Sequence, residues 1–390
     1  MRSLRFWQTL LEGLGCNELR SGNLIDRKLV RNIDVGVVLS ALALIFVGFV
    51  AIASSSGILM GGSTGRLKVQ IAAFFIGIIA ILIIMLFDYN TFADWDKPII
   101  IINILLLLSV FVIGVRHAGS LSWVEIGPIG FQPAEIVKIG FILVFAKHLA
   151  RKKDKLNTIP QIIPSLLYIA VPIGLILMQP DFGTALVFIF ISFFMLFEAG
   201  ISYKLIAGAI GSVLALLPLI WIFFFQNYQK NRILTFLNPE LDPMGSGYHV
   251  IQSKIAIGSG LFSGKGIFHG TQNNLGFIPA RQTDFIFSVI GEEIGFIGCV
   301  LVILLFMILL YRIMYVARVS KNDYGTLVCT GIMAMFLFHI LENIGMTIQL
   351  MPVTGIPLPF ISYGGSSLLA NMIALGIVLN IGMRRQVIRF

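Results

Sequence analysis

Asp284 is the residue whose type and position point most directly to chemistry. It ends a polar stretch and precedes a long apolar run in the string GFIPARQTDFIFSVIGEEIGF (276–296). An ionisable group placed where water, lipid headgroups and apolar helices meet is costly to keep, and such groups are functional candidates by default. The alternative interpretation is that Asp284 caps the helix that follows it. The residues alone leave both interpretations open.

A close ion pair is predicted in the string SWVEIGPIGFQPAEIVKIG (122–140). Pro133 suits the first turn of a helix, because the N–H that proline lacks is not needed there. Glu135 and Lys138 then stand three residues apart on one face of the helix. An ion pair inside a membrane can be purely structural, so this pattern alone does not assign a function.

Two irregular segments are expected at helix ends. The string QPDFGT (179–184) predicts a tight turn in which Asp181 caps the next helix. The string PVTGIPLPFISYGGSS (352–367) holds prolines and glycines that favour a rigid, non-helical hairpin. Irregular backbone at membrane depth is tolerated only where it is buried in protein or lines a cavity.

The composition places the chain in the membrane class. Its 390 residues are 57% apolar and 12% charged, and its mean hydropathy is +0.93, whereas soluble domains carry about 25% charged residues. We therefore expect one integral membrane domain. Cys16, Cys299 and Cys329 are too few and too scattered for a disulfide framework or a metal site.

Ten apolar runs are each close to the roughly 20 residues that cross a bilayer as a helix. They lie at about 35–55, 70–87, 98–115, 134–149, 161–178, 182–197, 205–225, 286–312, 325–349 and 366–383. The predicted fold is an all-α polytopic membrane protein of ten transmembrane helices, with a large extracytoplasmic loop between helices seven and eight. Residues 1–34 are expected to form a basic cytoplasmic segment without a cleavable signal peptide, 35–383 the membrane domain, and 384–390 a short cytoplasmic tail.

The Lys and Arg residues set the expected orientation. With both termini inside, 19 of the 28 lie on inner segments or adjoining helix ends, eight lie on outer segments, and Lys138 lies within the fourth run. This asymmetry predicts a multi-pass protein of the cytoplasmic (inner) membrane with both termini cytoplasmic. The net charge of +9 mostly reflects the same bias toward an anionic inner leaflet, and it does not indicate nucleic acid as a partner.

The predicted outer loop, 226–285, has about 60 residues and is rich in glycine. Loops of that length tend to be functional, although this one could also be a plain cap over helix ends. Within it, the segment from Val250 to Ile257 could lie in the membrane interface, with its apolar groups facing down and Ser253 and Lys254 facing up.

Five strings occur in a fixed order and agree in their side of the membrane: QPAEIVK, QPDFGT, GYHVIQSKIAIGSG, TDFIFSVIGEEIGF and PLPFISYGGSS. With them the chain resembles the SEDS family (shape, elongation, division and sporulation proteins) from the first run to the last. Within the family, GKG (264–266), GTQ (270–272) and the short tail resemble the RodA branch more than the FtsW branch. The resemblance implies a peptidoglycan glycosyltransferase that polymerises lipid II into glycan strands at the outer face of the cytoplasmic membrane, for cell elongation and rod shape.

The resemblance also implies partners. Besides lipid II, these are a class B penicillin-binding protein (a transpeptidase), other elongation-complex proteins and membrane lipids. No cofactor is certain, although a divalent cation could take part. The alternatives are a carrier (flippase) of the lipid-linked precursor, a division or sporulation paralogue of the FtsW or SpoVE type, and a non-catalytic scaffold. A carrier should show charged groups at mid-membrane and repeat symmetry, whereas the informative polar residues here crowd the outer half.

The resemblance assigns site residues by motif. The essential aspartate falls on Asp284, the acid and lysine of the fourth run on Glu135 and Lys138, the outer-loop tryptophan on Trp123, and the SYGGSS turn on 362–367, with Ser362 and Ser366 as substrate-binding candidates. Many relatives have PE-x-H-T-D before the aspartate, whereas Ala280 and Gln282 stand here. That departure weakens any mechanism that needs a second acid or a histidine at those two places.

The implied chemistry fits these residue types. Glycosyl transfer from a lipid diphosphate needs a base for the proton of the acceptor hydroxyl and cations for the departing diphosphate. The cationic candidates are Lys138, Arg232, Lys254, Lys265 and Arg66. The last three are also consistent with solvated or headgroup-facing positions.

Three polar residues lie within the ninth run, His339, Glu342 and Asn343. They could line a groove that reaches down from the outer face. The alternative is that they join helices through hydrogen bonds.

Overall fold

The computed structural model describes residues 31–58, 61–117, 120–126, 129–152, 159–208, 227–242 and 245–385, with a few isolated positions between 211 and 218. Most of the seventh predicted span, the basic segment before residue 31 and the end of the predicted tail lie outside the described residues.

Nine of the ten predicted spans are found as long helices. They are α3 (Val35–Ser55), α4 (Gly65–Leu86), α6 (Asp96–Ile113), α7 (Pro133–Ala150), α8 (Ile159–Met178), α9 (Phe182–Glu198), α14 (Ile286–Arg318), α15 (Asp323–Thr347) and α16 (Gly365–Met383). Six of them, α3, α4, α6, α14, α15 and α16, have the length and hydropathy of membrane spans, and α8 and α9 contain shorter apolar helices. The chain is therefore mostly helical, with several helices able to cross a membrane.

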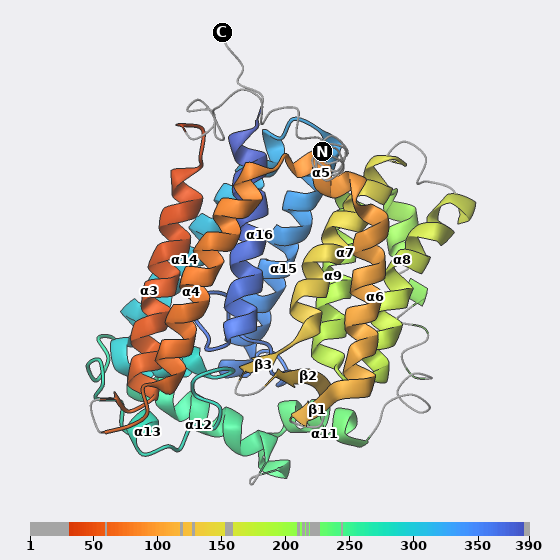
Figure 1. Ribbon diagram of the computed structural model, residues 1–390. Coiled ribbons are helices and arrows are strands. Elements are labelled where there is room, and N and C mark those ends of the chain that lie inside the picture. The colour runs from red at the N-terminus through yellow and green to blue at the C-terminus, as the bar shows by residue number, and fades with distance from the viewer. Residues whose placement is uncertain are drawn as a thin grey trace.

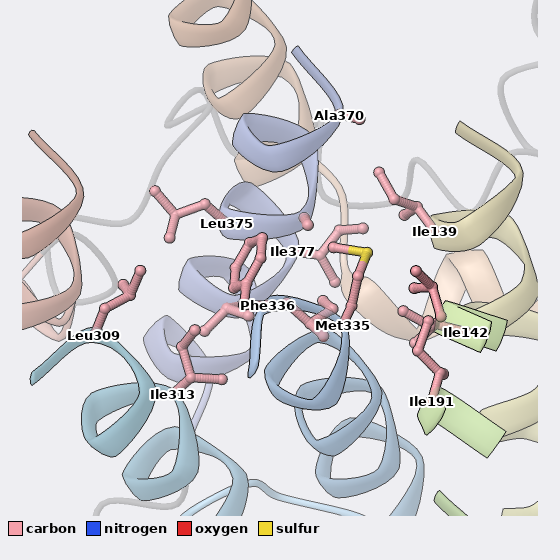
Figure 2. Close-up of a cluster of buried hydrophobic side chains, with 14 of the residues drawn as sticks. Ile139, Ile142, Ile191, Leu309, Ile313, Met335, Phe336, Ala370, Leu375 and Ile377 are labelled. Carbon is pink, nitrogen blue, oxygen red and sulfur yellow. The ribbon is translucent and has the colours of Figure 1, made fainter. Parts of the chain in front are cut away.

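The helices form a bundle around α15 and α16 (Figure 1). In it α4 packs against α16, α3 and α15 pack against α14, and α7 and α9 pack against α15. The side chains between them are apolar and buried, and Figure 2 shows part of this core, contributed by α7, α9, α14, α15 and α16. The outer faces of α4 and α6 are apolar as well, with exposed side chains such as Phe75, Ile79 and Leu105. Such faces suit contact with lipid rather than water.

Short elements gather at one end of the bundle (Figure 1), which we call the sheet end. They are α11 (Asn227–Leu237), the 3₁₀ helix η4 (Pro239–Leu241), α12 (Ser246–Ser259), α13 (Thr271–Asn274) and the sheet β1 (Gly114–His117), β2 (Ser120–Ile126) and β3 (Ile129–Phe131). The opposite end carries α5 (Tyr89–Asp94), which is hydrogen-bonded to the turn between α14 and α15 through Tyr89 and Asn322 (3.1 Å). The short elements at the sheet end therefore cover one end of the long helices.

The sheet was not predicted, and the fold is not entirely α-helical. Its three strands are antiparallel in the order β1-β2-β3, with Val115 opposite Trp123 and Val124 opposite Phe131. The backbone N–H of Leu121 donates to the carbonyl of Gln179 (3.0 Å), which ties β2 to the α8–α9 turn. Pairing of this kind satisfies backbone polar groups that could not stay unpaired at the edge of a membrane.

The predicted outer loop is an ordered cap in its described part, because α12 packs along α14. The expected orientation of α12 was wrong for one side chain. Ser253 is fully buried, and its hydroxyl contacts the Ser288 hydroxyl (2.6 Å) and donates to the carbonyl of Thr347 (2.7 Å). A hydroxyl that finds two protein partners gains by pointing inward. Lys254, on the neighbouring face, is exposed and donates to Gln349 Oε1 (2.8 Å).

Candidate active site

A cavity of about 500 Å³ opens at the sheet end between elements from many parts of the chain. Its polar lining includes Trp123 from β2, Glu135 and Lys138 from α7, Asp181 before α9, Arg232 from α11, His249 from α12, Asp284 before α14, His339 from α15 and Ser366 from α16. The fold therefore gathers in one place polar side chains that the sequence keeps far apart.

Asp284 is held in place through its backbone. Its carbonyl accepts a hydrogen bond from Asn343 Nδ2 (2.9 Å), and the same amide group donates to the carbonyl of Ile356 (2.8 Å). One side chain of α15 thus joins the segment before α14 to the hairpin 352–364, which is non-helical as predicted. Gly355 of this hairpin has φ +78°, and a Cβ atom there would lie 3.5 Å from Asp284 Oδ2. The hairpin therefore runs beside the carboxylate.

Ser362 is not among the residues that line the cavity. Together with Asn343 and Tyr363 it forms a set of groups, called the clamp, that hydrogen-bond to the backbone before α14. Its hydroxyl donates to the carbonyl of Thr283 (2.6 Å) and accepts from the N–H of Leu358 (2.8 Å). The N–H of Tyr363 donates to the carbonyl of Gln282 (2.8 Å). The carbonyls of Gln282, Thr283 and Asp284 therefore all accept hydrogen bonds. The Asp284 carboxylate is thus carried by a rigid backbone.

The carboxyl group of Asp284 has the properties of a base at neutral pH. Burial raises its pKa from the ordinary value to about 6, while a hydrogen bond from Thr283 and the positive charge of Arg232 act in the opposite direction. A carboxylate with that pKa is ionised at pH 7 and is a stronger proton acceptor than an exposed aspartate.

The helix-capping interpretation of Asp284 was wrong. The residue at the N-cap of α14 is Phe285, and among the described residues no side-chain cap accepts a hydrogen bond from the first turn. By contrast, the capping prediction for Asp181 is confirmed, because its carboxylate accepts from the N–H of Thr184 (3.1 Å) at the start of α9. Asp181 also receives a long bond from Gln132 Nε2 (3.4 Å), and burial raises the pKa of its carboxyl.

The ion pair predicted in the fourth span is present and buried. Lys138 Nζ lies 2.9 Å from Glu135 Oε1, and the two residues are 2% and 4% exposed. The ammonium group also lies 3.1 Å from His339 Nε2. A lysine has three N–H donors, and two of these contacts are present among the described residues.

Glu342 and Asn343 of α15 form hydrogen bonds, but their partners lie in non-helical segments and not in other helices as expected. Glu342 Oε1 accepts from the hydroxyl of Thr354 in the hairpin (2.7 Å), and Asn343 forms the clamp on Asp284. His339 has both roles, since it contacts Lys138 and also lines the cavity.

The start of α16 adds a further site for negative charge. Gly364, Ser366 and Ser367 line the cavity at the N-terminus of this helix. The N-terminal end of a helix carries a partial positive charge that favours anions. Ser366, a predicted substrate-binding residue, is therefore part of the cavity lining.

Four of the predicted site residues lie outside the cavity lining. Lys254 contacts Gln349, Lys265 pairs with Glu292 (2.8 Å), Ser362 belongs to the clamp, and Arg66 donates to Gln282 and lines a second, neighbouring cavity. Conversely, His249 and Thr354 line the cavity and were not predicted. Neither lies in a string whose spacing reveals it, because each reaches the cavity only through the packing of α12 and of the hairpin. Among the described residues, no group of three or more His, Cys, Asp and Glu side chains could hold a metal ion.

Comparison with known proteins identifies relatives over nearly the whole chain. The family model described as "Cell cycle protein", which covers FtsW, RodA and SpoVE, matches residues 35–387. The peptidoglycan glycosyltransferase MrdB of Escherichia coli (strain K12) is 36% identical over 361 residues, which cover 92% of this chain and 95% of MrdB. The peptidoglycan glycosyltransferase RodA of Treponema pallidum (strain Nichols) is 33% identical, covering 91% and 99%.

Two solved structures share the fold. One, described as "Structural coordination of polymerization and crosslinking by a peptidoglycan synthase complex", contains a chain with a TM-score of 0.78 and 32% identity, covering 90% of this chain and 98% of that one. The other is the rod shape determining protein RodA of Thermus thermophilus, with a TM-score of 0.68 and 29% identity, covering 90% and 97%.

Proposed function

This chain belongs to the FtsW, RodA and SpoVE family of cell cycle proteins, and we infer that it is a peptidoglycan glycosyltransferase of the RodA type that uses Asp284 as its general base. It is a multi-pass membrane protein. Its substrate is lipid II, the undecaprenyl-diphosphate-linked disaccharide pentapeptide, and its product is a glycan strand for cell elongation. One observation carries the mechanism: Asp284, Lys138 and Arg232 line a single cavity at the sheet end.

The reaction proceeds by displacement at the anomeric carbon of the donor sugar. Asp284 takes the proton of the acceptor hydroxyl, and the hydroxyl oxygen forms the new glycosidic bond. The bond between the anomeric carbon and the diphosphate oxygen breaks, and the lipid diphosphate leaves with the electron pair. Lys138 and Arg232 stabilise the negative charge that develops on the leaving group, since charge-assisted hydrogen bonds to phosphate are strong.

The buried position of Lys138 supports this assignment. Glu135 and His339 hold its ammonium group in one place, so little reorganisation is needed when charge develops on the diphosphate. Preorganised charges of this kind are a large source of rate enhancement. Trp123 and Ser366, which line the same cavity, are then placed to contact the sugar and the phosphates.

The sheet end faces the outside of the cytoplasmic membrane, and both termini are cytoplasmic. The asymmetry of Lys and Arg supports this orientation, and the substrate would then be met on the side where glycan is built. A cysteine placed at Gln272 in α13 should react with a membrane-impermeant reagent in intact cells. Reaction only after the cells are opened would contradict the orientation.

The chain also works with a class B penicillin-binding protein. The solved relative from a peptidoglycan synthase complex supports such a partner, and the outer ends of α14 and α15 are the proposed docking surface. Co-purification should recover a transpeptidase with one membrane helix. Recovery of the lone chain, under conditions that preserve other membrane complexes, would count against this partner.

Incubation of the purified protein with lipid II tests the enzymatic function. Glycan strands should form with lipid II and fail to form when the 4-hydroxyl of its terminal sugar is methylated, because that hydroxyl is the nucleophile. The reaction should be run with and without the transpeptidase, so that a partner requirement is not mistaken for inactivity. Absence of strands in both cases would overturn the function.

A further inference from the structure

A second cavity of about 330 Å³ adjoins the residues that precede Asp284. Ala280, Thr283 and Tyr363 line both cavities, so the two share a wall. The second cavity differs from the first in its charge, because its lining holds Arg66 and Arg281 and no acidic side chain among the described residues. It is therefore a separate cationic site that adjoins the catalytic one.

The two guanidinium groups have only neutral partners among the described residues. Arg66 Nη1 donates to Gln282 Oε1, and Arg281 Nη1 donates to the carbonyl of Asn273. Within the described part of the chain, no carboxylate forms an ion pair with either arginine. Each guanidinium has five N–H donors, so most of them are available to a ligand.

The geometry places two positive charges close together in a partly enclosed space. Burial and the charge of Arg66 both lower the pKa of Arg281. Arg66 is exposed and Arg281 is half-buried, so water screens part of the repulsion, and an anion bound between the two groups would relieve the rest. Two forked guanidinium groups match the oxygens of a phosphate or diphosphate better than a single lysine would.

The site is also preformed. Gln282, which orients Arg66, donates through Nε2 to the carbonyl of Ser55 (3.0 Å) at the end of α3, and its own carbonyl accepts from Tyr363 (2.8 Å). Three parts of the chain that are distant in sequence, α3, α4 and the hairpin, thus meet at this one residue. An arginine fixed in this way loses less entropy when a ligand binds.

Polymerisation of lipid-linked disaccharides requires two such positions. The diphosphate of the donor is bonded to the carbon that is attacked, so it must lie in the same cavity as Asp284. The diphosphate of the acceptor lies at the other end of its disaccharide from the attacking hydroxyl. It must therefore be held beside the catalytic cavity rather than in it.

We propose that Arg66 and Arg281 bind the diphosphate of the acceptor substrate. The proposal rests on the proposed glycosyltransferase function and adds a role for two residues that the mechanism above does not use. Gln282 is a positioning residue for Arg66. The proposal also gives a reason for a glutamine at this position, since its side chain joins the arginine to α3.

A single-coupling reaction between two analogues tests the proposal. The donor is lipid II with a methylated 4-hydroxyl, which cannot accept, and the acceptor is lipid II with a methylene group in place of the anomeric oxygen, which cannot donate. In the Arg66→Gln/Arg281→Gln variant, the KM for the acceptor should rise by on the order of 10-fold or more, and the KM for the donor should stay within about 2-fold. A rise in the donor KM alone, or no change in either, would overturn the proposal.

Three controls make the result specific. Arg116→Gln removes an exposed cation of β1 that lines neither cavity, and it should leave both KM values unchanged. The Arg66→Lys/Arg281→Lys variant should recover part of the acceptor affinity, which a folding defect would not allow. Failure of the wild-type protein to couple the two analogues would argue against the glycosyltransferase function itself, so the two failures are distinguishable.

An acceptor analogue with an uncharged linker identifies the group that is bound. The wild-type protein should prefer the diphosphate acceptor to the uncharged one, and the double glutamine variant should lose that preference. If the arginines instead bind a phospholipid headgroup, the preference would persist in the variant, and vesicles enriched in phosphatidylglycerol would affect only the wild-type protein. That outcome would overturn the proposal.

Discussion

The segment 284–293 contains three carboxylates in two different environments, Asp284 in one and Glu292 and Glu293 in the other. Asp284 lines the cavity at the sheet end, and Thr283 and Arg232 are the groups that favour its charged form. Two turns further along α14, Glu292 and Glu293 are almost completely buried among hydrogen-bond donors. The two sets differ in their partners: Glu292 and Glu293 use their charge in hydrogen bonds within the fold, whereas Asp284 lines a cavity.

Glu292 and Glu293 hold the loop that covers α14. Glu292 accepts from Lys265 Nζ (2.8 Å) and from the backbone N–H groups of Gln272 (2.8 Å) and Asn273 (3.0 Å). Glu293 accepts from the Ser54 hydroxyl (2.5 Å), from Asn273 Nδ2 (3.0 Å) and from the N–H of Phe268 (3.2 Å).

The kink at Gly295, with φ +73°, frees two N–H groups of α14. Those of Phe296 and Ile297 donate to loop carbonyls (2.9 and 3.2 Å). Together with the carboxylate contacts, these hydrogen bonds fix the loop to α14.

The largest expected effect is on catalysis. Asp284→Asn should lower the rate of glycan formation by roughly 10²-fold or more, the usual scale for a lost acid–base group. Thermal stability in detergent should change little, because this side chain does not cap α14. The matched control is Asp94→Asn, the same chemical change on an exposed residue at the opposite end of the bundle. An Asp284→Asn variant with the wild-type rate would end the assignment of the base.

The second effect is on stability. Glu292→Ala should destabilise the fold by about 3 kcal/mol, since it leaves several buried donors without an acceptor. A thermal melt in detergent should show this as a lower Tm, with the rate per folded molecule reduced far less than by Asp284→Asn. An unchanged Tm together with a large loss of rate would show that Glu292 acts in catalysis and not in stability.

The third effect concerns the buried ion pair of α7. Lys138→Ala should weaken polymerisation more than Glu135→Gln, because Lys138 supplies charge to the leaving group and Glu135 positions it. Were the pair only structural, both changes would lower the folded yield alike, since each would leave a buried partner uncompensated. Activity per folded molecule, with the Tm of each variant, distinguishes the two cases.

A pH profile gives a smaller and more selective effect. The raised pKa of Asp284, about 6, means that the carboxylate is protonated as the pH falls through that value. The protonated form cannot accept a proton, so kcat/KM should fall by about tenfold for each unit below pH 6. The residual activity of the Asp284→Asn variant should lack this step. An identical step in that variant would assign the titration to another group.

The smallest effect is expected at Lys265, which the sequence analysis placed among the substrate-binding residues. The lysine side chain is 26% exposed, whereas its partner Glu292 is fully buried and keeps the N–H groups of Gln272 and Asn273 as donors. A glutamine at this position can still donate to that carboxylate, so Lys265→Gln should cost about 1 kcal/mol in stability and leave the KM for lipid II unchanged. A several-fold rise in KM would show that Lys265 contributes to substrate binding after all.

The features that the sequence predicted correctly depend on nearby residues. The long helices follow from runs of apolar residues, the Glu135–Lys138 pair from a spacing of three, and the cap at Asp181 from a turn motif. Each is decided within one element, so its pattern is visible in one string of the sequence.

The features that were missed depend on packing between distant segments. The contact of Lys138 with His339 joins residues 201 apart, and Gln282 reaches Ser55 across 227. Ser253 turns inward because Ser288 and Thr347 happen to lie beneath it. No local periodicity contains these partners. The sheet is a different case, because its three strands are consecutive in the sequence and pair locally.

The clamp on Asp284 has a consequence for the order in which the protein is made. The groups that fix its backbone, Asn343, Ser362 and Tyr363, are all translated after it. A nascent chain that has inserted α14 already contains the catalytic carboxylate but not the helix and hairpin that hold it. If Asp284 is the base, as proposed, we expect the protein to be inactive during its own synthesis and to become active only when its last helices have entered the membrane. A chain truncated before residue 350 should insert and yet make no glycan.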